Sequence, residues 1–251
     1  MHLIEYRTSP SEKQRTEDLL KLMPTSGGTA LDIGARDGHF SLLLAERFDK
    51  VVALDLARPE IEHPRVNCVQ GNAASLEFAD RSFDFVFCAE VLEHLPQETL
   101  NSVCSEIERV GNGQILIGVP YKQDIRVGRT TCYSCKGKNP PWGHVNTFDE
   151  QRIVELFPAF KAELISLVGK STDQTNSVSA ALMDLAGNPY GTYEQDEPCI
   201  HCGAKLTPPP ERKLPQKILT KMALWTRTAT EVFSKPRGSW IHLLLARKGD
   251  A

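Results

Sequence analysis

The sequence lacks a hydrophobic run long enough to cross a membrane, since its longest apolar runs, such as Ile241 to Ala246, have only the length of a strand. It also lacks a strong excess of one charge: the formal net charge is −3, which gives no clear nucleic-acid surface. The first twenty residues are polar, unlike a signal peptide or a transmembrane segment. We therefore expect a soluble, cytoplasmic protein.

Internal repeats are also lacking, so a solenoid or a repeat array is not expected. A chain of 251 residues is long enough for one α/β domain with an insertion, or for a domain with a small module.

The most informative segment is a strand, a glycine turn, a helix and a second strand. An apolar run from Thr29 to Ile33 precedes Gly34-Ala35-Arg36-Asp37-Gly38, and a helical pattern then extends from His39 to Phe48. A second apolar run, Val51 to Leu54, ends on Asp55. Glycines let the backbone approach a ligand closely, and an acidic residue after the second strand can accept hydrogen bonds from ribose hydroxyls. This order is half of a nucleotide-binding α/β unit.

The rest of the chain extends the same alternation of strands and helices. Further strand patterns cover residues 66–69, 83–88, 114–119, 162–168 and 240–247, and helical patterns cover residues 11–23, 96–110 and 149–156. The pattern predicts an α/β fold with a doubly wound, mainly parallel Rossmann-like sheet and helices on both faces.

Four motifs carry a resemblance to a known family. They are D-I-G-x-x-x-G from Asp32, G-N-A from Gly71, S-F-D-x-V from Ser82 and E-V-L-E-H-L from Glu90. Together they resemble the class I S-adenosylmethionine (SAM) dependent methyltransferases of the small-molecule type, over roughly residues 28–168, with residues 240–247 as the final strand. Two positions depart from that family's pattern, because Arg36 stands where glycine is usual and Asn72 where aspartate is usual.

The resemblance implies SAM as cofactor and assigns roles at the carboxyl ends of the strands. Asp32 and Gly34 would face the methionine part, Asp55 the ribose, and Leu56 with Asn72 the adenine. Glu90 would lie near the reactive methyl group. The full implied set is Asp32, Gly34, Gly38, Asp55, Leu56, Asn72, Ala73 and Glu90.

Methyl transfer from SAM requires an aligned acceptor and, for a hydroxyl or amine, removal of a proton. His144 is the leading candidate base, because the segment from Gly143 to Phe148 resembles the G-H-x-x-x-F segment that these methyltransferases place over the active site. Glu90 is the second candidate catalytic residue. A histidine that only fixes the loop is an equally supported interpretation, and His94 is a weaker candidate whose role we expect to be structural.

The cysteines divide into two groups. Cys68, Cys88 and Cys104 stand singly in apolar contexts and are expected to be small buried hydrophobes. The other four form two C-x-x-C pairs, which are Cys132 with Cys135 and Cys199 with Cys202. Two such pairs can supply the four tetrahedral ligands of a structural zinc ion. A redox-active dithiol, or replacement of one thiolate by His201 or His144, stays open as an alternative.

The predicted domain organisation follows from these patterns. Residues 1–120, 144–170 and 238–251 are assigned to the SAM-binding domain, and residues 121–143 and 171–237 to an inserted zinc-binding or lid region. A helical pattern over residues 214–233 carries Lys213, Lys217, Lys221 and Arg227 beside an apolar stripe. A helix packed on the core is the favoured interpretation, and peripheral contact with a membrane surface or a partner is the alternative.

The sequence thus predicts a methyltransferase that transfers the SAM methyl group to a small-molecule or sugar-containing acceptor, at a hydroxyl. The alternative is a catalytically weak binding module of the same fold, whose zinc element recognises a protein or RNA partner.

Overall fold

The computed structural model describes residues 7–231 and 235–249, which form two compact units. The first, named here the sheet unit, comprises residues 10–121, 148–169 and the described residues from 240 onward. The second, named here the cysteine unit, comprises the remaining described residues, chiefly 122–147 and 170–239. His144 belongs to the cysteine unit, and Phe148, the first residue of the next segment of the sheet unit, forms a parallel bridge to Tyr121.

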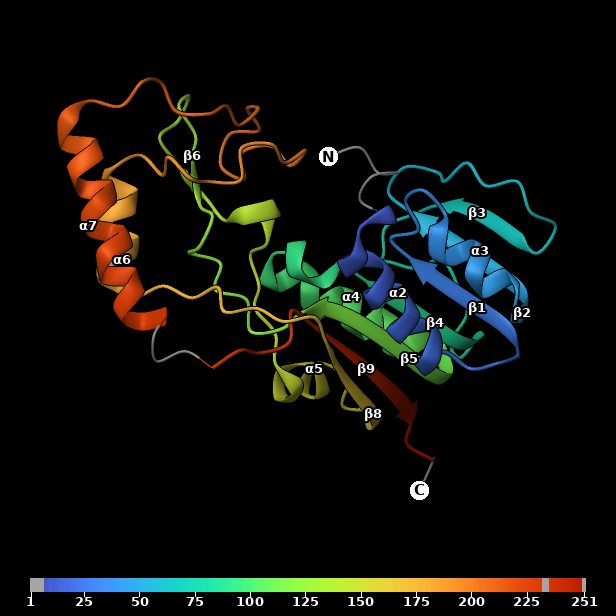
Figure 1. The fold of residues 1–251 in the computed structure, drawn as a ribbon. Helices are drawn as coiled ribbons and strands as arrows, with labels where there is room; N and C mark the ends of the chain where they lie inside the picture. Colours follow the sequence, from blue (N-terminus) through green and yellow to red (C-terminus); the bar gives the residue numbers. More distant parts are fainter. Residues whose placement is uncertain (1–6, 232–234, 250–251) are drawn as a thin grey trace. The chain divides into compact units, whose positions relative to one another are not determined.

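The described part of the sheet unit contains a seven-stranded sheet in the order β3-β2-β1-β4-β5-β9-β8 (Figure 1). Strands β1 to β5 pair in parallel, whereas β9 runs antiparallel between β5 and β8. The prediction of a doubly wound, mainly parallel sheet is confirmed. The strands are β1 (Gly27–Ile33), β2 (Phe48–Asp55), β3 (Val66–Gln70), β4 (Phe83–Ala89), β5 (Gly111–Pro120), β8 (Phe160–Val168) and β9 (Trp240–Arg247).

Helices cover both faces of this sheet, because its strands present apolar side chains to both sides. On β4, Phe85 and Phe87 pack with helices α2 (Pro10–Leu22) and α3 (His39–Ala45). The alternate residues Val86 and Cys88 pack on the other side with α4 (Gln97–Val110) and α5 (Glu150–Leu156). A short 3₁₀ turn, η1 (Leu92–His94), follows β4, and its first residue, Leu92, packs in the same core as Val86 and Cys88.

One predicted helix is too long. The sequence pattern predicts a helix from His39 to Phe48. In the structure α3 ends at Ala45, and Phe48 begins β2, where it pairs with Gly27. The Phe48 ring occupies the space that a side chain at position 27 would need, and it stacks on Phe85 with ring centroids 5.2 Å apart. Phe48 has the spacing of an apolar helix residue, but it belongs to the sheet.

The cysteine unit has little regular structure apart from two helices. Its described elements are the two-stranded sheet β6 (Thr130–Thr131) with β7 (Lys138–Asn139), the turn η2 (Pro141–Gly143), α6 (Ser177–Leu185) and α7 (Leu214–Glu231). A small apolar cluster consists of Cys132, Tyr193, Cys199 and Leu206, with Tyr133 and Ala204 packed against it. Among the described residues, we find no helix of the length and hydrophobicity needed to span a membrane.

Candidate functional site

The expected ligand crevice of the sheet unit lies at the carboxyl ends of β1 and β4. These two strands are parallel neighbours, while β2 lies on the other side of β1, so the strand order changes direction between β1 and β4. Open α/β sheets bind ligands at such a switch point. The loop from Gly34 to Gly38 follows β1, and Glu90 follows β4, so both lie at this point.

Asp32 ties the end of β1 to the helix that follows. Its side chain is 2% exposed, and its Oδ2 accepts a hydrogen bond of 2.5 Å from Ser41 Oγ on α3. A buried carboxylate needs such hydrogen bonds, since an unpaired one would carry a large desolvation cost. Asp32 therefore joins the end of β1 to α3.

The two glycines of the loop have backbones that other residues rarely adopt. Gly34 has φ 77° and Gly38 has φ 78°. A side chain at position 34 would also collide with Val91, and one at position 38 with Ile61. Glycine is required at both positions by backbone conformation and by space.

Two backbone N–H groups orient the Asp55 carboxylate. The N–H of Arg36 donates to Oδ2 at 2.9 Å, and the N–H of Leu56 donates to Oδ1 at 2.7 Å. A carboxylate oxygen can accept more than one hydrogen bond, so both oxygens can also accept from a ribose diol. Arg36 has φ 46°, and its backbone reaches Asp55 although the position lacks the usual glycine.

The implied adenine end is formed by Leu56 and the turn after β3. Leu56 is 72% exposed and offers apolar surface to a flat ring. Asn72 Oδ1 accepts the Ala74 N–H at 3.0 Å, and the partly buried Ala73 packs on the core. The Asn72 oxygen thus stabilises the turn. Its NH₂ group is what distinguishes it from an aspartate, because this group donates hydrogen bonds.

Glu90 adopts φ 57°, and its backbone N–H donates to the Gly118 carbonyl at 2.9 Å. Arg15 on α2 places Nη1 3.7 Å from Glu90 Oε1, and it is paired with Glu12 through two hydrogen bonds of 2.7 and 2.8 Å. Glu12 and Arg15 are 1% and 2% exposed. This buried pair is not predicted by the sequence pattern. Its signal is weak, because charges three residues apart on a helix are usually solvated.

Two neighbouring titratable groups have shifted pKa values. Burial raises the pKa of Glu93 well above its usual range, and the nearby Glu90 carboxylate raises it further. Burial lowers the pKa of His94, and the positive charge of Arg36 acts in the same direction. Both groups therefore favour their neutral forms.

His144, the candidate base, is 7% exposed, and its Nδ1 lies 2.6 Å from Gln123 Oε1. Because an amide oxygen only accepts, this contact assigns the proton to Nδ1 and leaves Nε2 unprotonated in the neutral ring. Gln123 and Thr147 also line a cavity of about 530 Å³ within the cysteine unit. The other lining residues are Lys122, Asp124, Ile125, Arg126, Arg129, Gln174 and Thr175.

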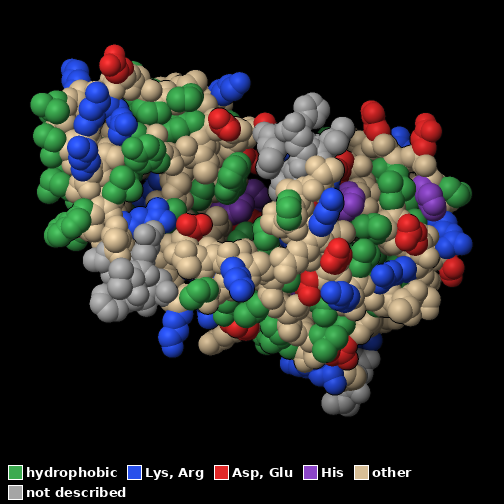
Figure 2. Space-filling model, in the orientation of Figure 1, with side chains coloured by type: hydrophobic (Ala, Val, Ile, Leu, Met, Phe, Trp, Pro, Cys, Tyr) green, Lys and Arg blue, Asp and Glu red, His purple; other side chains and the backbone are tan. Residues whose placement is uncertain are grey.

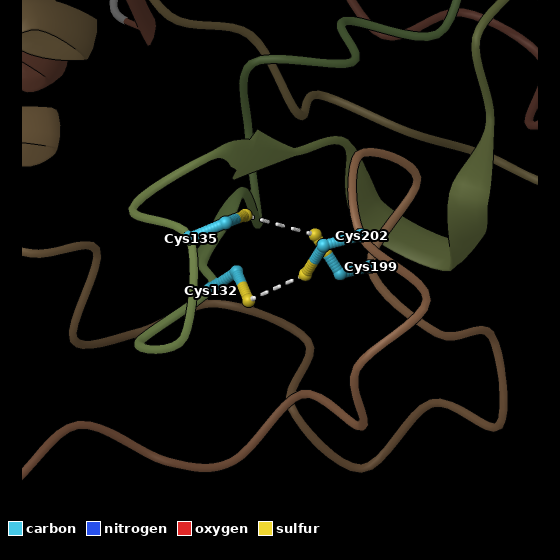
Figure 3. Close-up of side chains that lie close together, drawn as sticks. All are labelled: Cys132, Cys135, Cys199 and Cys202. Atoms are coloured by element: carbon cyan, nitrogen blue, oxygen red, sulfur yellow. Dashed lines mark hydrogen bonds between the residues drawn. The ribbon is translucent and has the colours of Figure 1, made fainter.

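The four paired cysteines lie together in the cysteine unit (Figure 3). Cys132 Sγ lies 3.7 Å from Cys202 Sγ, and Cys135 Sγ lies 3.6 Å from Cys199 Sγ, so no disulfide is formed. Four sulfurs at about 2.3 Å from a tetrahedral zinc ion would be separated by about 3.8 Å. The arrangement therefore fits the ligand geometry of a closed thiolate site.

The two C-x-x-C segments fold into the same turn. The N–H of Lys136 donates to the Cys132 carbonyl at 2.7 Å, and that of Gly203 to the Cys199 carbonyl at 2.8 Å. These equivalent residues have φ 64° and 71°. In the first segment Lys136 takes the left-handed position that Gly203 takes in the second. Gly137 follows one residue later, where a side chain would collide with His201.

Backbone amides around the cluster stabilise thiolates. The Cys135 N–H is the main cause that lowers the pKa of Cys132 to about 6. The pKa of Cys199 is also lowered: burial opposes this, and the N–H groups of His201 and Cys202 outweigh it. The Ala204 N–H would lower the pKa of Cys202, but the neighbouring sulfurs raise it to about 12. Sulfurs this close repel one another when ionised, and a bound cation would relieve that repulsion.

The alternative in which a histidine replaces a thiolate is not favoured. His201 Nε2 lies 3.0 Å from the Lys138 carbonyl and therefore carries a proton that it donates there. Within the part of the chain that the structure describes, the cysteine cluster comprises four thiols and no histidine.

Residues 31–117 match the protein-family model described as "Methyltransferase domain". A Mycolicibacterium smegmatis protein described as a SAM-dependent methyltransferase is 32% identical over 112 residues, 42% of this chain and 43% of that protein. A Mycobacterium tuberculosis (H37Rv) protein with the same description is 31% identical over 107 residues, 40% of this chain and 39% of that protein. The chain thus matches less than half the length of these relatives.

Solved structures share the fold at lower identity. A Bacillus halodurans protein provisionally described as a methyltransferase has a TM-score of 0.56 at 18% identity, covering 93% of this chain and 100% of that one. The N-methyltransferase NodS of Bradyrhizobium japonicum, in complex with S-adenosyl-L-homocysteine, has a TM-score of 0.50 at 19% identity, covering 66% and 84%. The [4+2]-cyclase SpnF has a TM-score of 0.54 at 15% identity, covering 93% and 80%. These likenesses show the fold alone.

Residues 31–117, which contain the glycine loop and the strands on both sides of the switch point, are therefore similar to a methyltransferase domain.

Proposed function

We propose that the chain transfers the methyl group of SAM to a hydroxyl of a small-molecule or sugar-containing acceptor. The observation that carries the proposal is the Asp55 carboxylate, which two backbone N–H groups orient at the end of β2, beside the loop at the switch point. An oriented carboxylate at this place suits the two hydroxyls of a ribose.

The binding roles follow the order of the strands. SAM would supply a methyl group already activated by its sulfonium. In this proposal Asp32, Gly34 and Gly38 shape the loop for the methionine part, and Asp55 holds the ribose. Leu56, Asn72 and Ala73 contact the adenine, and Glu90 lies beside the reacting methyl group.

His144 is proposed as the general base. Its ring is oriented by Gln123, and in the tautomer assigned by this contact Nε2 carries the lone pair that would accept the proton of an attacking hydroxyl. The mostly polar lining of the adjoining cavity suits a hydroxylated ligand more than an apolar one. We therefore propose this cavity as the acceptor-binding surface of the cysteine unit.

We further propose that Cys132, Cys135, Cys199 and Cys202 hold a structural zinc ion. Four thiolates would leave no open position, so the ion would order the cysteine unit and take no part in the reaction. The small apolar cluster around the sulfurs supports this role, since such a cluster buries little surface by itself.

The experiment that tests the function uses calorimetric titration with SAM and transfer of a radiolabelled methyl group to a panel of hydroxylated small molecules. His144→Ala should lower turnover by about 10²–10⁴-fold and leave SAM affinity nearly unchanged. Gln123→Ala should have a smaller effect, because it removes only the orientation of the ring.

Full turnover in His144→Ala would remove this residue from the mechanism, and His94→Ala would then be the next variant to measure. A protein that binds no SAM, and that transfers no methyl group, would overturn the proposal in favour of a binding module.

A further inference from the structure

Helix α7 has its large apolar side chains on the outside. Leu214, Ile218, Met222 and Trp225 are 71%, 51%, 49% and 80% exposed. At about 100° per residue, these four positions lie within an arc of about 80° and form one stripe. Side chains of this kind normally face a core, so the stripe requires an explanation.

The inner face of α7 is formed by small residues instead. Ala223 and Thr220 are 0% and 2% exposed, and they lie on the side opposite the stripe. Helix α6 contacts this inner face, where Ser179 Oγ donates to the Ala223 carbonyl at 2.7 Å and Asn176 Nδ2 to the Thr226 carbonyl at 2.8 Å. The favoured sequence interpretation is a helix packed on the core with a solvated basic face. Helix α7 does pack through one face, but Ile218, Met222 and Trp225 of the expected apolar stripe are exposed, and Val232 and Phe233 lie outside the described residues.

The charge beside the stripe has one sign. Lys213, Lys217 and Lys221 are exposed and repeat every four residues, so they form a row along one flank of the stripe. The sequence contains no acidic residue from position 212 to position 230. Figure 2 shows this face, on which green apolar and blue basic side chains gather over α7.

We propose that α7 docks on the surface of a lipid bilayer that contains anionic lipids. An apolar stripe with a row of lysines is the arrangement of a helix that lies in the interface, where the ammonium groups meet lipid phosphates. Trp225 suits this position, since its ring is apolar and its N–H can bond to the polar layer. A second copy of the chain would bring two lysine rows together, and the like charges would repel.

The test uses the full chain and vesicles of two compositions in a co-sedimentation assay. Vesicles of phosphatidylcholine with phosphatidylserine should bind the protein at least about tenfold more tightly than vesicles of phosphatidylcholine alone. Binding should weaken as salt is raised from 0.1 to 1 M, because the Debye length shrinks from about 10 to about 3 Å. The environment of Trp225 should become less polar on binding, seen as a blue shift of tryptophan fluorescence.

Matched variants separate the stripe and the lysine row from general effects. Trp225→Ala, and Lys217→Glu with Lys221→Glu, should each weaken binding to the anionic vesicles about tenfold or more. Leu42→Ala removes a 43% exposed apolar side chain of α3, and Lys161→Glu reverses an exposed charge of β8, so both should bind as the parent protein does. Hydrogen exchange in residues 122–147 and 170–231 of every variant reports whether the cysteine unit is folded.

Equal binding to both kinds of vesicle, or unchanged binding in the α7 variants, would overturn the proposal. A dimer that Trp225→Ala dissociates would also overturn it, since the stripe would then be covered by a second copy. If the chain binds an acidic protein through α7 and binds neither kind of vesicle, the face would be assigned to a protein partner instead. None of these outcomes depends on methyl transfer.

Discussion

The backbone N–H of Arg36 donates a 2.9 Å hydrogen bond to Oδ2 of Asp55, and this bond joins the loop after β1 to the end of β2. It depends on the left-handed backbone of Arg36 and not on its side chain. The contact explains how the loop keeps its shape without the usual glycine.

Asp55→Ala should weaken SAM binding by about 1.5–3 kcal/mol, the scale of hydrogen bonds to a charged group. Asp49→Ala is the matched control, because Asp49 is an exposed acid near the start of the same strand. Calorimetric titration measures both. Unchanged SAM affinity in Asp55→Ala would refute the ribose role.

Elemental analysis of protein purified without added metal should find about one zinc ion per chain. Cys135→Ser should lose the ion, and hydrogen exchange should rise in residues 122–147 and 170–231. The sheet unit should keep its protection, because its two hydrophobic cores contain no residue of the cysteine unit. Cys68→Ser, which changes a thiol outside the cluster, should keep the ion. Metal-free protein with the cysteine unit equally protected, or a disulfide among the four thiols, would contradict the zinc site.

The two equivalent turns predict different responses to substitution. Gly203→Ala should destabilise the zinc-loaded protein by about 1 kcal/mol, since alanine disfavours the left-handed backbone. A side chain at position 203 would meet nothing within 4 Å, so the cost arises from the backbone alone. Lys136→Gly should leave stability nearly unchanged, because relief of the same strain is offset by the greater freedom of the unfolded chain. Urea unfolding checks both, and equal losses would contradict the equivalence.

Stability should fall as the pH decreases from about 6.5 to about 4 through His242. Burial lowers the pKa of this histidine to about 4, although the hydrogen bond of 2.6 Å to Asp18 opposes the shift. In this window the unfolded chain binds a proton that the folded protein does not, and the contribution lost is of the order of 3 kcal/mol. Urea unfolding of the parent protein and of His242→Gln at pH 6.5 and at pH 4 checks this, and the variant should lose less stability between the two pH values. Glu93 also titrates abnormally, but both proteins contain it, so its effect cancels in the comparison.

Much of the sheet unit could be predicted because its patterns are local. The apolar runs, the glycine loop and the terminal acid of β2 each lie within a few residues, and the structure places them as the motifs indicated. The end of α3 could not be predicted, because Phe48 is in phase with the helix and only its pairing with Gly27 makes it part of a strand.

The parts that were missed depend on contacts between distant segments. The buried Glu12–Arg15 pair is held near Glu90, which lies 75 residues beyond Arg15, and nothing in the helix pattern distinguishes it from a solvated pair. The exposed stripe of α7 reads as a core stripe, since a sequence shows which face is apolar but not which face is covered. The C-x-x-C spacing predicted that each pair of thiols could share one ion. The structure brings the two pairs together.

The separation of the thiols also has a consequence for synthesis. Cys132 and Cys202, which lie 3.7 Å apart, are 70 residues apart in the chain. At about 5–20 residues per second, the ribosome adds the second pair roughly 4–14 s after the first. During that time the nascent chain contains only two of the four cluster thiols, while β1 to β5 have already been made. A four-sulfur site can therefore close only late, after most of the sheet has been synthesised.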